Sequence, residues 1–535
     1  MRRRNSRLLA LVLTLITGAA GLTVTGTPAQ AAGTIAWTPC AENADLDCGT
    51  VTVPVDWAAP AGPTIEIALA RHRATDPDAR VGSLLINPGG PGQSGVSSVL
   101  SSTFDGDLAR RFDIVGFDPR GVARSAPILC SLEAIYGLPS SRITSQARFD
   151  VMVAANRALT DDCRARTGPV FDHVDTGQTV RDMDAIRAAL GEEQLNFFGM
   201  SYGTLMAQQY AENFPARVRA IVADSNMDHS VDPAGWFATE AQALQDSFDA
   251  FVTGCKRISS CALSNRDIRQ FWGRLLTRAA RGELADPDAP GTRYTQESLI
   301  NLLADYLAYD AYWLPLAETL RNIDEGRPSS RTLRGAANAV EQQAARLSPF
   351  ARAGSVPFAA LADETPGEPP SVVNFSYAAI YCQDWDMRVA DYPAWSRLVK
   401  QAATHAPDFP FAPRSEHAPA LCLGGTLPVN NPQHRLSAQP ATPLLLVNSV
   451  HDLATGYNWA TAAAGQLGDA AVLLTYDGMG HIAYGRTACI DDRIVEYLST
   501  RTPPAAGTHC AATPVPGTAE AGRSEVGGEL VAAGK

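Results

Sequence analysis

Short apolar runs alternate with segments of helical periodicity between residues 33 and 227. The runs are bounded by turn residues and have the length of buried strands: Ile65–Ala70, Ser83–Asn87, Asp113–Phe117, Leu195–Gly199 and Val218–Ala223. Thr179–Leu190 and Tyr202–Asn213 have helical spacing, and Pro215 ends the second. Strands that alternate with helices predict a mostly parallel sheet covered on both faces.

The periodicity becomes helical from about residue 228 to 440 and then returns to the alternating pattern. The helical segments are Trp236–Phe251, Ile268–Ala280, Gln296–Leu307 and Leu316–Ile323. The later part has two strand-like and two helix-like segments: Pro443–Val447, Tyr457–Gln466, Ala471–Thr475 and Asp491–Ser499. We therefore expect a doubly wound α/β core in two parts, residues 32–227 and 441–512, interrupted late by a helical cap at 228–440.

The two ends of the chain have different character. Arg2, Arg3, Arg4 and Arg7 precede an apolar run, Leu8–Ile16, and Ala29-Gln30-Ala31 fits a signal-peptidase site. Residues 1–31 are therefore predicted to be a signal peptide, too short in its apolar run to be a permanent membrane anchor. Residues 513–535 contain few groups to bury and are expected to be disordered.

Cysteine content and charge restrict the classes of function. Ten cysteines, all after residue 31, are typical of an exported protein, and pairing between sequence neighbours is expected. The candidate pairs are Cys40 with Cys48, Cys130 with Cys163, Cys255 with Cys261, Cys382 with Cys422, and Cys489 with Cys510. The chain has neither a C-x-x-C pair nor an H-E-x-x-H helix, so no metal or other cofactor is expected. A net charge of −12 argues against nucleic acid as a partner.

The first chemical motif is Gly199-Met200-Ser201-Tyr202-Gly203. It joins a predicted strand to a predicted helix, where a sharp turn pushes the serine outward and requires small residues two positions before and after it. Ser201 is therefore the candidate nucleophile.

A glycine-rich turn, Asn87–Gly95, follows another predicted strand. Such a turn lets backbone N–H groups approach a substrate oxyanion. Gly90, Gly92 and Gly95 also match the dinucleotide pattern G-x-G-x-x-G. Pro88 and Pro91 lack the N–H donors that a phosphate needs, and no helical pattern opens clearly at Gly95, so the nucleotide interpretation is disfavoured.

A candidate acid and a candidate base follow the last two predicted strands, in the order Ser…Asp…His. Asp452 comes after Pro443–Ser449, and His481 follows Ala471–Tyr476 within Gly478-Met479-Gly480-His481. An imidazole can remove the serine proton, and a carboxylate fixes the imidazole tautomer and stabilises the imidazolium. Asp224, after the strand Val218–Ala223, is the rival acid, and Asp118 is interpreted as structural.

Taken together, these motifs resemble the tripeptidyl-aminopeptidase branch of the proline-iminopeptidase-like serine peptidases, an α/β-hydrolase family exported by actinobacteria. The likeness extends from Ile35 to Cys510 and includes Asn87–Gly95, Phe112–Gly121, Gly199–Thr204, Tyr381–Asp384, Asp452–Ala460 and Gly480–Cys489. The resemblance implies a triad of Ser201, Asp452 and His481, with the backbone N–H groups of Gly90 and Tyr202 as the oxyanion hole. Asn87-Pro88 differs from proline iminopeptidases proper, which have His before the glycines, and agrees with the tripeptidyl branch. The chain departs from the usual family pattern at Asp224–Asn226, where Asp-Gly is more usual, and at Leu453 and Thr455-Gly456, where Pro and Thr-Pro are usual. The cap is the region least alike.

The leading hypothesis is release of short peptides, as tripeptides, from free N-termini of peptides or proteins through an acyl-enzyme. Glu240 and Asp384 are candidate carboxylates for the substrate ammonium, with an ordinary structural role as the alternative for both. A carboxylesterase or lipase would use the same triad, because the Ser–His–Asp set does not separate amides from esters. A non-catalytic binding protein on this fold is the third class considered.

Overall fold

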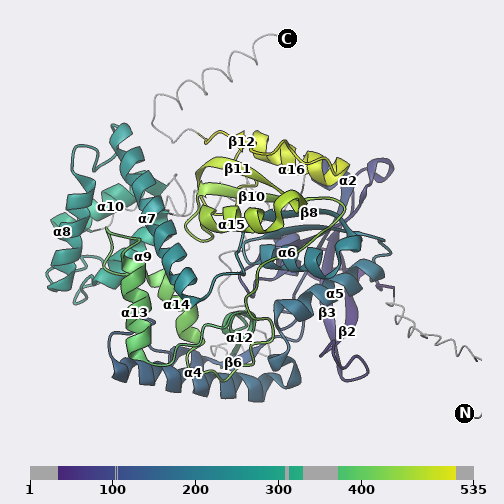
Figure 1. Cartoon of the computed structure of the whole chain (residues 1–535), viewed down its shortest axis with the longest axis horizontal. Coiled ribbons are helices and arrows are strands. Elements are labelled where there is room, and N and C mark those ends of the chain that lie inside the picture. The colour runs from purple at the N-terminus through teal and green to yellow at the C-terminus, as the bar shows by residue number, and fades with distance from the viewer. Residues whose placement is uncertain (1–33, 103, 105, 308–311, 329–370, 514–535) are drawn as a thin grey trace, which may run out of the picture.

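The computed structural model describes residues 34–102, 104, 106–307, 312–328 and 371–513. The predicted signal peptide, residues 1–31, and residues 514–535 of the predicted tail lie outside these residues. Two regions are apparent in Figure 1: a large sheet with its flanking helices, and a helical region beside it.

The sheet has ten strands in the described residues, in the order β1-β2-β3-β5-β4-β7-β8-β10-β11-β12. The strands from β5 to β12 in this order are parallel, and β1, β2 and β3 add an antiparallel edge. Their bounds are β1 Thr38–Pro39, β2 Asp47–Pro54, β3 Thr64–His72, β4 Gly82–Asn87, β5 Phe112–Phe117, β7 Leu195–Met200, β8 Val218–Asp224, β10 Leu444–His451, β11 Ala471–Met479 and β12 His509–Cys510. This arrangement confirms the predicted fold class.

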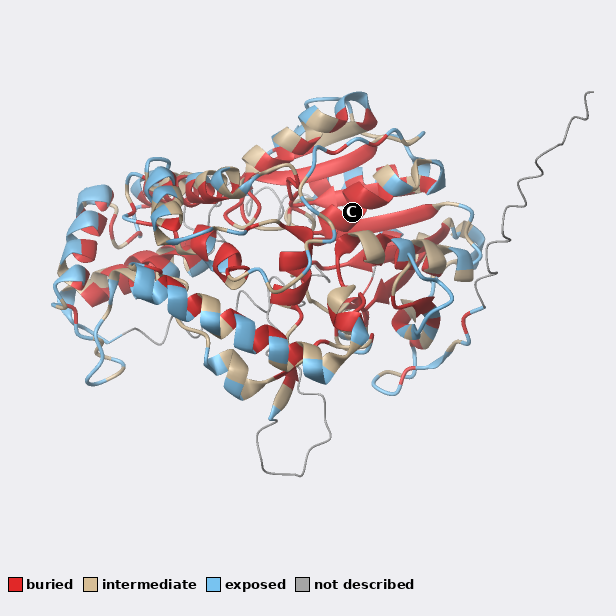
Figure 2. Cartoon of the chain, turned by 60° about the horizontal axis from the view of Figure 1, so that its bottom comes forward, coloured by how far each residue is buried: buried red, intermediate tan, exposed pale blue. Residues whose placement is uncertain are grey.

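Helices cover both faces of the parallel strands, and the strands' side chains alternate between two cores. One core contains Leu84, Ile86 and Phe198, and the other contains Leu85 and Phe197. The first is covered by α1 (Gly95–Ser101), α2 (Gly106–Arg111) and α16 (Ala488–Thr500), and the second by α5 (Thr176–Ala189), α6 (Gly203–Asn213) and α15 (Tyr457–Leu467). Figure 2 shows the central strands buried along their length. Burial on both faces explains why these strands are continuous apolar runs in the sequence.

The cap contains seven helices with described bounds: α7 (Pro233–Arg257), α8 (Ile268–Ala280), α9 (Gln296–Leu307), α10 (Trp313–Glu325), α12 (Tyr377–Asp384), α13 (Tyr392–Ala403) and α14 (Pro413–Leu421). Their apolar faces share one core. In Figure 2 the outer helices expose one face and bury the other.

The helical region also includes a segment that the sequence prediction placed in the first part of the core. Helix α4 (Gln146–Thr167) buries Phe149 and Met152 in the cap's core, and Asn156 Nδ2 donates hydrogen bonds to Ala420 O and Leu423 O. Strand β6 (Leu129–Ser131) pairs with β9 (Val372–Asn374) in a separate two-stranded sheet. The assignment of this segment to the core is thus wrong, because its apolar surface packs against α13 and α14 instead of the sheet.

Five disulfides join the ten cysteines in the pairs expected from sequence proximity: Cys40–Cys48, Cys130–Cys163, Cys255–Cys261, Cys382–Cys422 and Cys489–Cys510. None of the described helices combines the length and hydrophobicity that a membrane span requires.

Candidate active site

Ser201 occupies a strained turn between β7 and α6. Its φ of 54° lies in the left-handed region, and its backbone N–H donates to Asp224 O at 2.9 Å. A Cβ on Gly199 would lie 2.2 Å from Gly203 O, and one on Gly203 would lie 2.8 Å from Asn87 O. The two glycines are therefore required by close packing, and the surrounding backbone holds the serine in a conformation that costs free energy.

The carboxylate of Asp452 lies beside the imidazole of His481. His481 Nδ1 is 3.0 Å from Asp452 Oδ2 and 3.1 Å from Oδ1. Asp452 is buried and also accepts hydrogen bonds from the backbone N–H groups of Ala454 and Thr455 and from Thr455 Oγ1. Burial opposes ionisation, but the pKa of Asp452 is nevertheless lowered because His481 and the hydrogen-bond donors favour the carboxylate. His481 Nε2 has no hydrogen-bond partner among the described residues, which leaves it available to a serine hydroxyl.

Thr455 lies in the segment Asp452–Ala460 of the family resemblance, but the sequence assigned it no role. Its hydroxyl donates to Asp452 Oδ2 at 3.0 Å and lies 3.5 Å from His481 Nδ1. The signal for this contact is the spacing, since an aspartate commonly accepts hydrogen bonds from residues two and three positions further along a turn.

The rival acid, Asp224, holds the loop after His481 instead of the imidazole. It is fully buried, and its carboxylate accepts hydrogen bonds from the backbone N–H groups of Ala483, at 2.9 Å, and Tyr484, at 2.8 Å. Ser225 Oγ accepts from Ile482 N at 2.8 Å. Burial raises the pKa of Asp224 to about 6. The geometry favours Asp452 as the partner of the imidazole. Asp224 instead fixes the backbone of the loop that follows His481.

The glycine-rich turn lies directly against the serine. Gly89 has a φ of 96°, and a Cβ there would lie 2.4 Å from Met200 O and 2.9 Å from Ser201 Cβ. The Gly89 N–H donates to Asn87 Oδ1 at 2.9 Å. The N–H groups of Gly90 and Tyr202 donate to no acceptor among the described residues. Both therefore remain candidate donors to a substrate oxygen.

One argument against a nucleotide site was wrong, because α1 does begin at Gly95. The structure supplies a different argument. Asp118 is buried, accepts a hydrogen bond from Val96 N at 3.1 Å, and pairs with the Ser94 hydroxyl. This carboxylate occupies the helix N-terminus where a pyrophosphate would have to bind. The predicted structural role of Asp118 agrees with these contacts.

The two candidate ammonium ligands differ in their surroundings. Glu240, on α7, is 6% exposed, and its Oε2 lies 4.0 Å from Arg414 Nε. Burial raises the pKa of Glu240 to about 7; Arg414 opposes this shift, and the negative charge of Asp452 adds to it. Glu240 therefore remains a candidate for the substrate ammonium.

Asp384, in contrast, is fully buried, and both of its carboxylate oxygens accept hydrogen bonds from other residues of the protein. Its carboxylate accepts hydrogen bonds from Thr176 N, Thr176 Oγ1 and Tyr202 OH at 2.7 Å and from Asn431 Nδ2 at 2.8 Å. Burial, with a contribution from Asp175, raises the pKa of Asp384 to about 7. Four protein donors on its oxygens favour the structural alternative for Asp384 over binding of the substrate ammonium.

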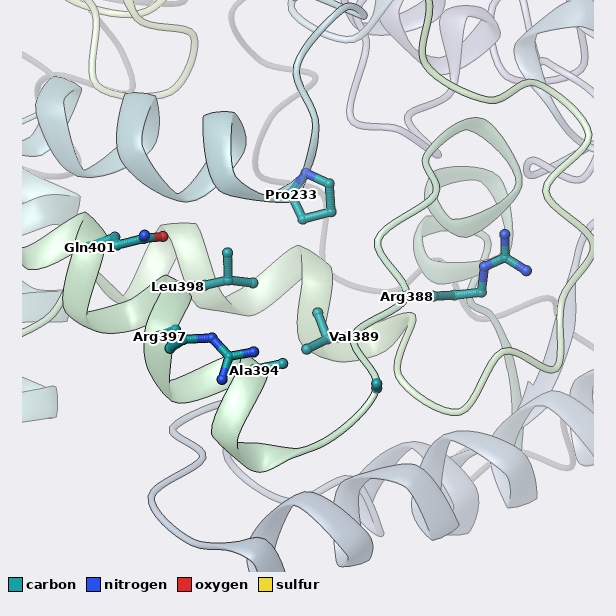
Figure 3. Close-up of a pocket in the computed structure, with 8 residues that line it drawn as sticks. Pro233, Arg388, Val389, Ala394, Arg397, Leu398 and Gln401 are labelled. Carbon is teal, nitrogen blue, oxygen red and sulfur yellow. The ribbon is translucent and has the colours of Figure 1, made fainter.

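Figure 3 shows a surface pocket of about 270 Å³ in the cap. Its lining is formed by the start of α7, the segment before α13 and α13 itself: Pro233, Arg388, Val389, Ala390, Ala394, Arg397, Leu398 and Gln401. None of the candidate catalytic residues contributes to it, so we do not assign substrate binding to this pocket.

Comparison with known proteins agrees with this geometry. Residues 82–344 match a model described as the alpha/beta hydrolase fold, and residues 408–510 match one described as TAP-like protein. Serine protease Hip1 of Mycobacterium tuberculosis is 30% identical to the chain over 508 residues, which cover 89% of this chain and 91% of that protein. Tripeptidyl aminopeptidase of Streptomyces coelicolor is 30% identical over 529 residues, with 93% and 90% covered. Carboxylesterase B of M. tuberculosis is 30% identical over 481 residues, with 87% and 86% covered.

The fold and these relatives define a serine hydrolase of the α/β-hydrolase class. Within that class, the chain belongs to the tripeptidyl-aminopeptidase-like family.

Proposed function

We propose that this protein is an exported serine exopeptidase that releases tripeptides from the free N-termini of peptides and proteins. The observation that carries the hydrolytic part is the buried Asp452 carboxylate on His481 Nδ1. The strained strand-to-helix turn that holds Ser201 supports the same proposal. Export is supported by the signal-like residues 1–31 and the five disulfides.

In the proposed reaction, His481 Nε2 takes the proton of Ser201 Oγ as the oxygen attacks the peptide carbonyl carbon. The oxyanion of the tetrahedral intermediate accepts hydrogen bonds from the N–H groups of Gly90 and Tyr202. The C–N bond then breaks, and the imidazolium of His481 protonates the leaving amine. Water attacks the acyl-enzyme with His481 again as the base, and the released peptide leaves with a new C-terminal carboxylate.

Glu240 is the proposed partner of the substrate ammonium. It is buried on the cap helix α7, and Arg414 is the one opposite charge within 4.0 Å of its carboxylate among the described residues. A bound ammonium would stabilise the ionised form of a carboxyl that burial makes reluctant to ionise. This contact would restrict cleavage to substrates with a free amino terminus.

The test of this assignment is the replacement of Glu240 by Gln. We expect kcat/KM for a free-amine tripeptidyl amide to fall at least tenfold, which corresponds to about 1.4 kcal/mol of lost transition-state stabilisation. The same substrate with an acetylated amine should be a poor substrate for both proteins and should show little difference between them. Equal losses on the two substrates would contradict an ammonium contact.

The second candidate is a carboxylesterase, favoured by the 30% identity to carboxylesterase B. The same Ser201 chemistry would then act on short acyl esters. A higher kcat/KM on a simple acyl ester than on any free-amine peptide amide would favour this alternative.

A further inference from the structure

The side chain of Tyr202 leaves the core and enters the cap. Tyr202 directly follows Ser201, and the residue is 2% exposed. Its hydroxyl donates to Asp384 Oδ2 at 2.7 Å and accepts a hydrogen bond from Trp385 Nε1 at 3.2 Å. Tyr202, which contributes the proposed second oxyanion donor, is therefore hydrogen-bonded to the C-terminal residue of α12.

Asp384 is itself held from several directions. Thr176, at the start of α5, donates two hydrogen bonds to the carboxylate, and Asn431 donates a third. The Asp384 carbonyl oxygen lies 2.7 Å from His229 Nε2, and the disulfide Cys382–Cys422 joins α12 to the end of α14. A carboxylate with this many fixed partners can hold the tyrosine hydroxyl in one position.

The position of the Tyr202 backbone matters because an oxyanion donor is effective only over a narrow range of distances to the developing charge. Ser201 and Tyr202 form a turn with an unfavourable φ at the serine, and such a turn persists only when its surroundings over-determine it. The backbone contacts in the core fix Ser201, through Asp224 O. The hydroxyl contact in the cap fixes the next residue.

We propose that Asp384 is a positioning residue, which acts through the Tyr202 hydroxyl to hold the Tyr202 N–H in the oxyanion hole and thereby links the cap to catalysis. This inference rests on the proposed serine-hydrolase mechanism but not on the choice of peptide over ester.

The test compares two tyrosines of the same helix region. Tyr202→Phe removes the hydroxyl and keeps the ring and the backbone N–H. Tyr210→Phe is the matched control, because Tyr210 lies on α6 and its hydroxyl also donates to a carboxylate, Asp184, at 3.2 Å. We expect Tyr202→Phe to lower kcat about tenfold with KM changed less than about threefold, a part of the 10²–10³-fold effect of removing an oxyanion donor outright. Tyr210→Phe should leave kcat unchanged even where it lowers the melting temperature.

A double-mutant cycle with Asp384→Asn tests whether the two groups act together. Asp384→Asn should also lower kcat, and Tyr202→Phe combined with Asp384→Asn should be no worse than the more damaging single variant. Three results would overturn the inference. The kcat losses of the two single variants could multiply in the double variant, the kcat of Tyr202→Phe could lie within twofold of wild type, or Tyr210→Phe could lose as much kcat as Tyr202→Phe.

The rate of covalent labelling by a fluorophosphonate is the second readout. It requires Ser201 and the oxyanion hole but no peptide substrate, so it should fall in Tyr202→Phe and stay unchanged in Tyr210→Phe. If the wild-type enzyme is labelled but cleaves no peptide, the exopeptidase proposal fails. The inference on Asp384 is then decided by the labelling rates of Tyr202→Phe and Tyr210→Phe alone. If labelling of wild type does not depend on Ser201, the underlying mechanism fails first.

Discussion

At the scale of single residues, the site brings two buried aspartates, Asp452 and Asp224, to the imidazole of His481 and to the loop after it. The strand-to-helix position of Ser201 is visible in the sequence because glycines must flank such a turn. Asp452 and Asp224 both follow parallel strands, so the sequence offers two acids at one edge of the sheet. Only the fold distinguishes them: Asp452 contacts the imidazole of His481, and Asp224 contacts the backbone beyond it. Contacts that cross from cap to core, such as Tyr202 with Asp384, have no local signature.

The two acids should respond differently to amide replacement. We expect Asp452→Asn to lower kcat/KM by about 10⁴-fold, because the amide no longer stabilises the imidazolium or its correct tautomer. Asp224→Asn should cost less, because it disturbs the loop that carries His481 and not the imidazole itself. Steady-state kinetics on both purified variants, with circular dichroism to verify folding, checks this order; a folded Asp224→Asn that is the less active of the two would reverse the assignment.

At the scale of elements, the parallel strands are the best-predicted part of the fold, because burial on both faces makes them continuous apolar runs. Helix α4 was not anticipated, since its apolar face reaches a partner more than 200 residues away in sequence. Strand β2, at the antiparallel edge, was also missed: it alternates between buried and exposed positions and lacks an apolar run. Local periodicity therefore identified the central parallel strands but missed α4, whose partner is distant in sequence, and β2, which has no apolar run.

The last helix offers a test at this scale. The disulfide Cys489–Cys510 joins the first turn of α16 to β12 across a separation of 21 residues. A loop of that length is worth on the order of 3 kcal/mol in the chain-entropy model. Replacing both cysteines by Ser should clearly lower the melting temperature. Activity at low temperature should fall only modestly, because the bridge anchors α16, which begins seven residues after His481, and does not contact the imidazole itself. Calorimetry and activity at 10 °C measure the two effects; unchanged stability, or activity lost in a protein that remains folded, would show that the bridge has a different role.

The whole molecule buries several carboxyl groups at unfavourable cost. Burial raises the pKa of Glu240, Asp384 and Glu416 to about 7, and those of Asp224 and Asp491 to about 6. Such a carboxyl has a higher pKa in the folded state than in the unfolded state. At a pH between these two pKa values, the folded protein therefore binds more protons than the unfolded chain. These groups therefore make the protein more stable as the pH falls from about 7 towards 5. His229 acts in the opposite direction, because burial lowers its pKa to about 4.

We therefore expect a higher melting temperature at pH 6 than at pH 8. The carboxyl contributions outnumber those of His229 and of His417, whose pKa burial also lowers. Each kcal/mol moves the melting temperature of a large domain by about 2–4 °C. Glu416→Gln removes one titrating carboxyl beside Arg142 and should reduce the difference. Calorimetry at the two pH values decides the point, and a melting temperature that is equal or lower at pH 6 would contradict the argument.

The most direct test of the proposed function is mass analysis of the products released from a peptide library with free and acetylated N-termini. The account predicts free tripeptides from the unblocked members, intact acetylated members, and no products from a Ser201→Ala enzyme, whose kcat should be at least about 10⁴-fold lower. Internal cleavage, equal cleavage of acetylated peptides, or products that persist with Ser201→Ala would contradict it.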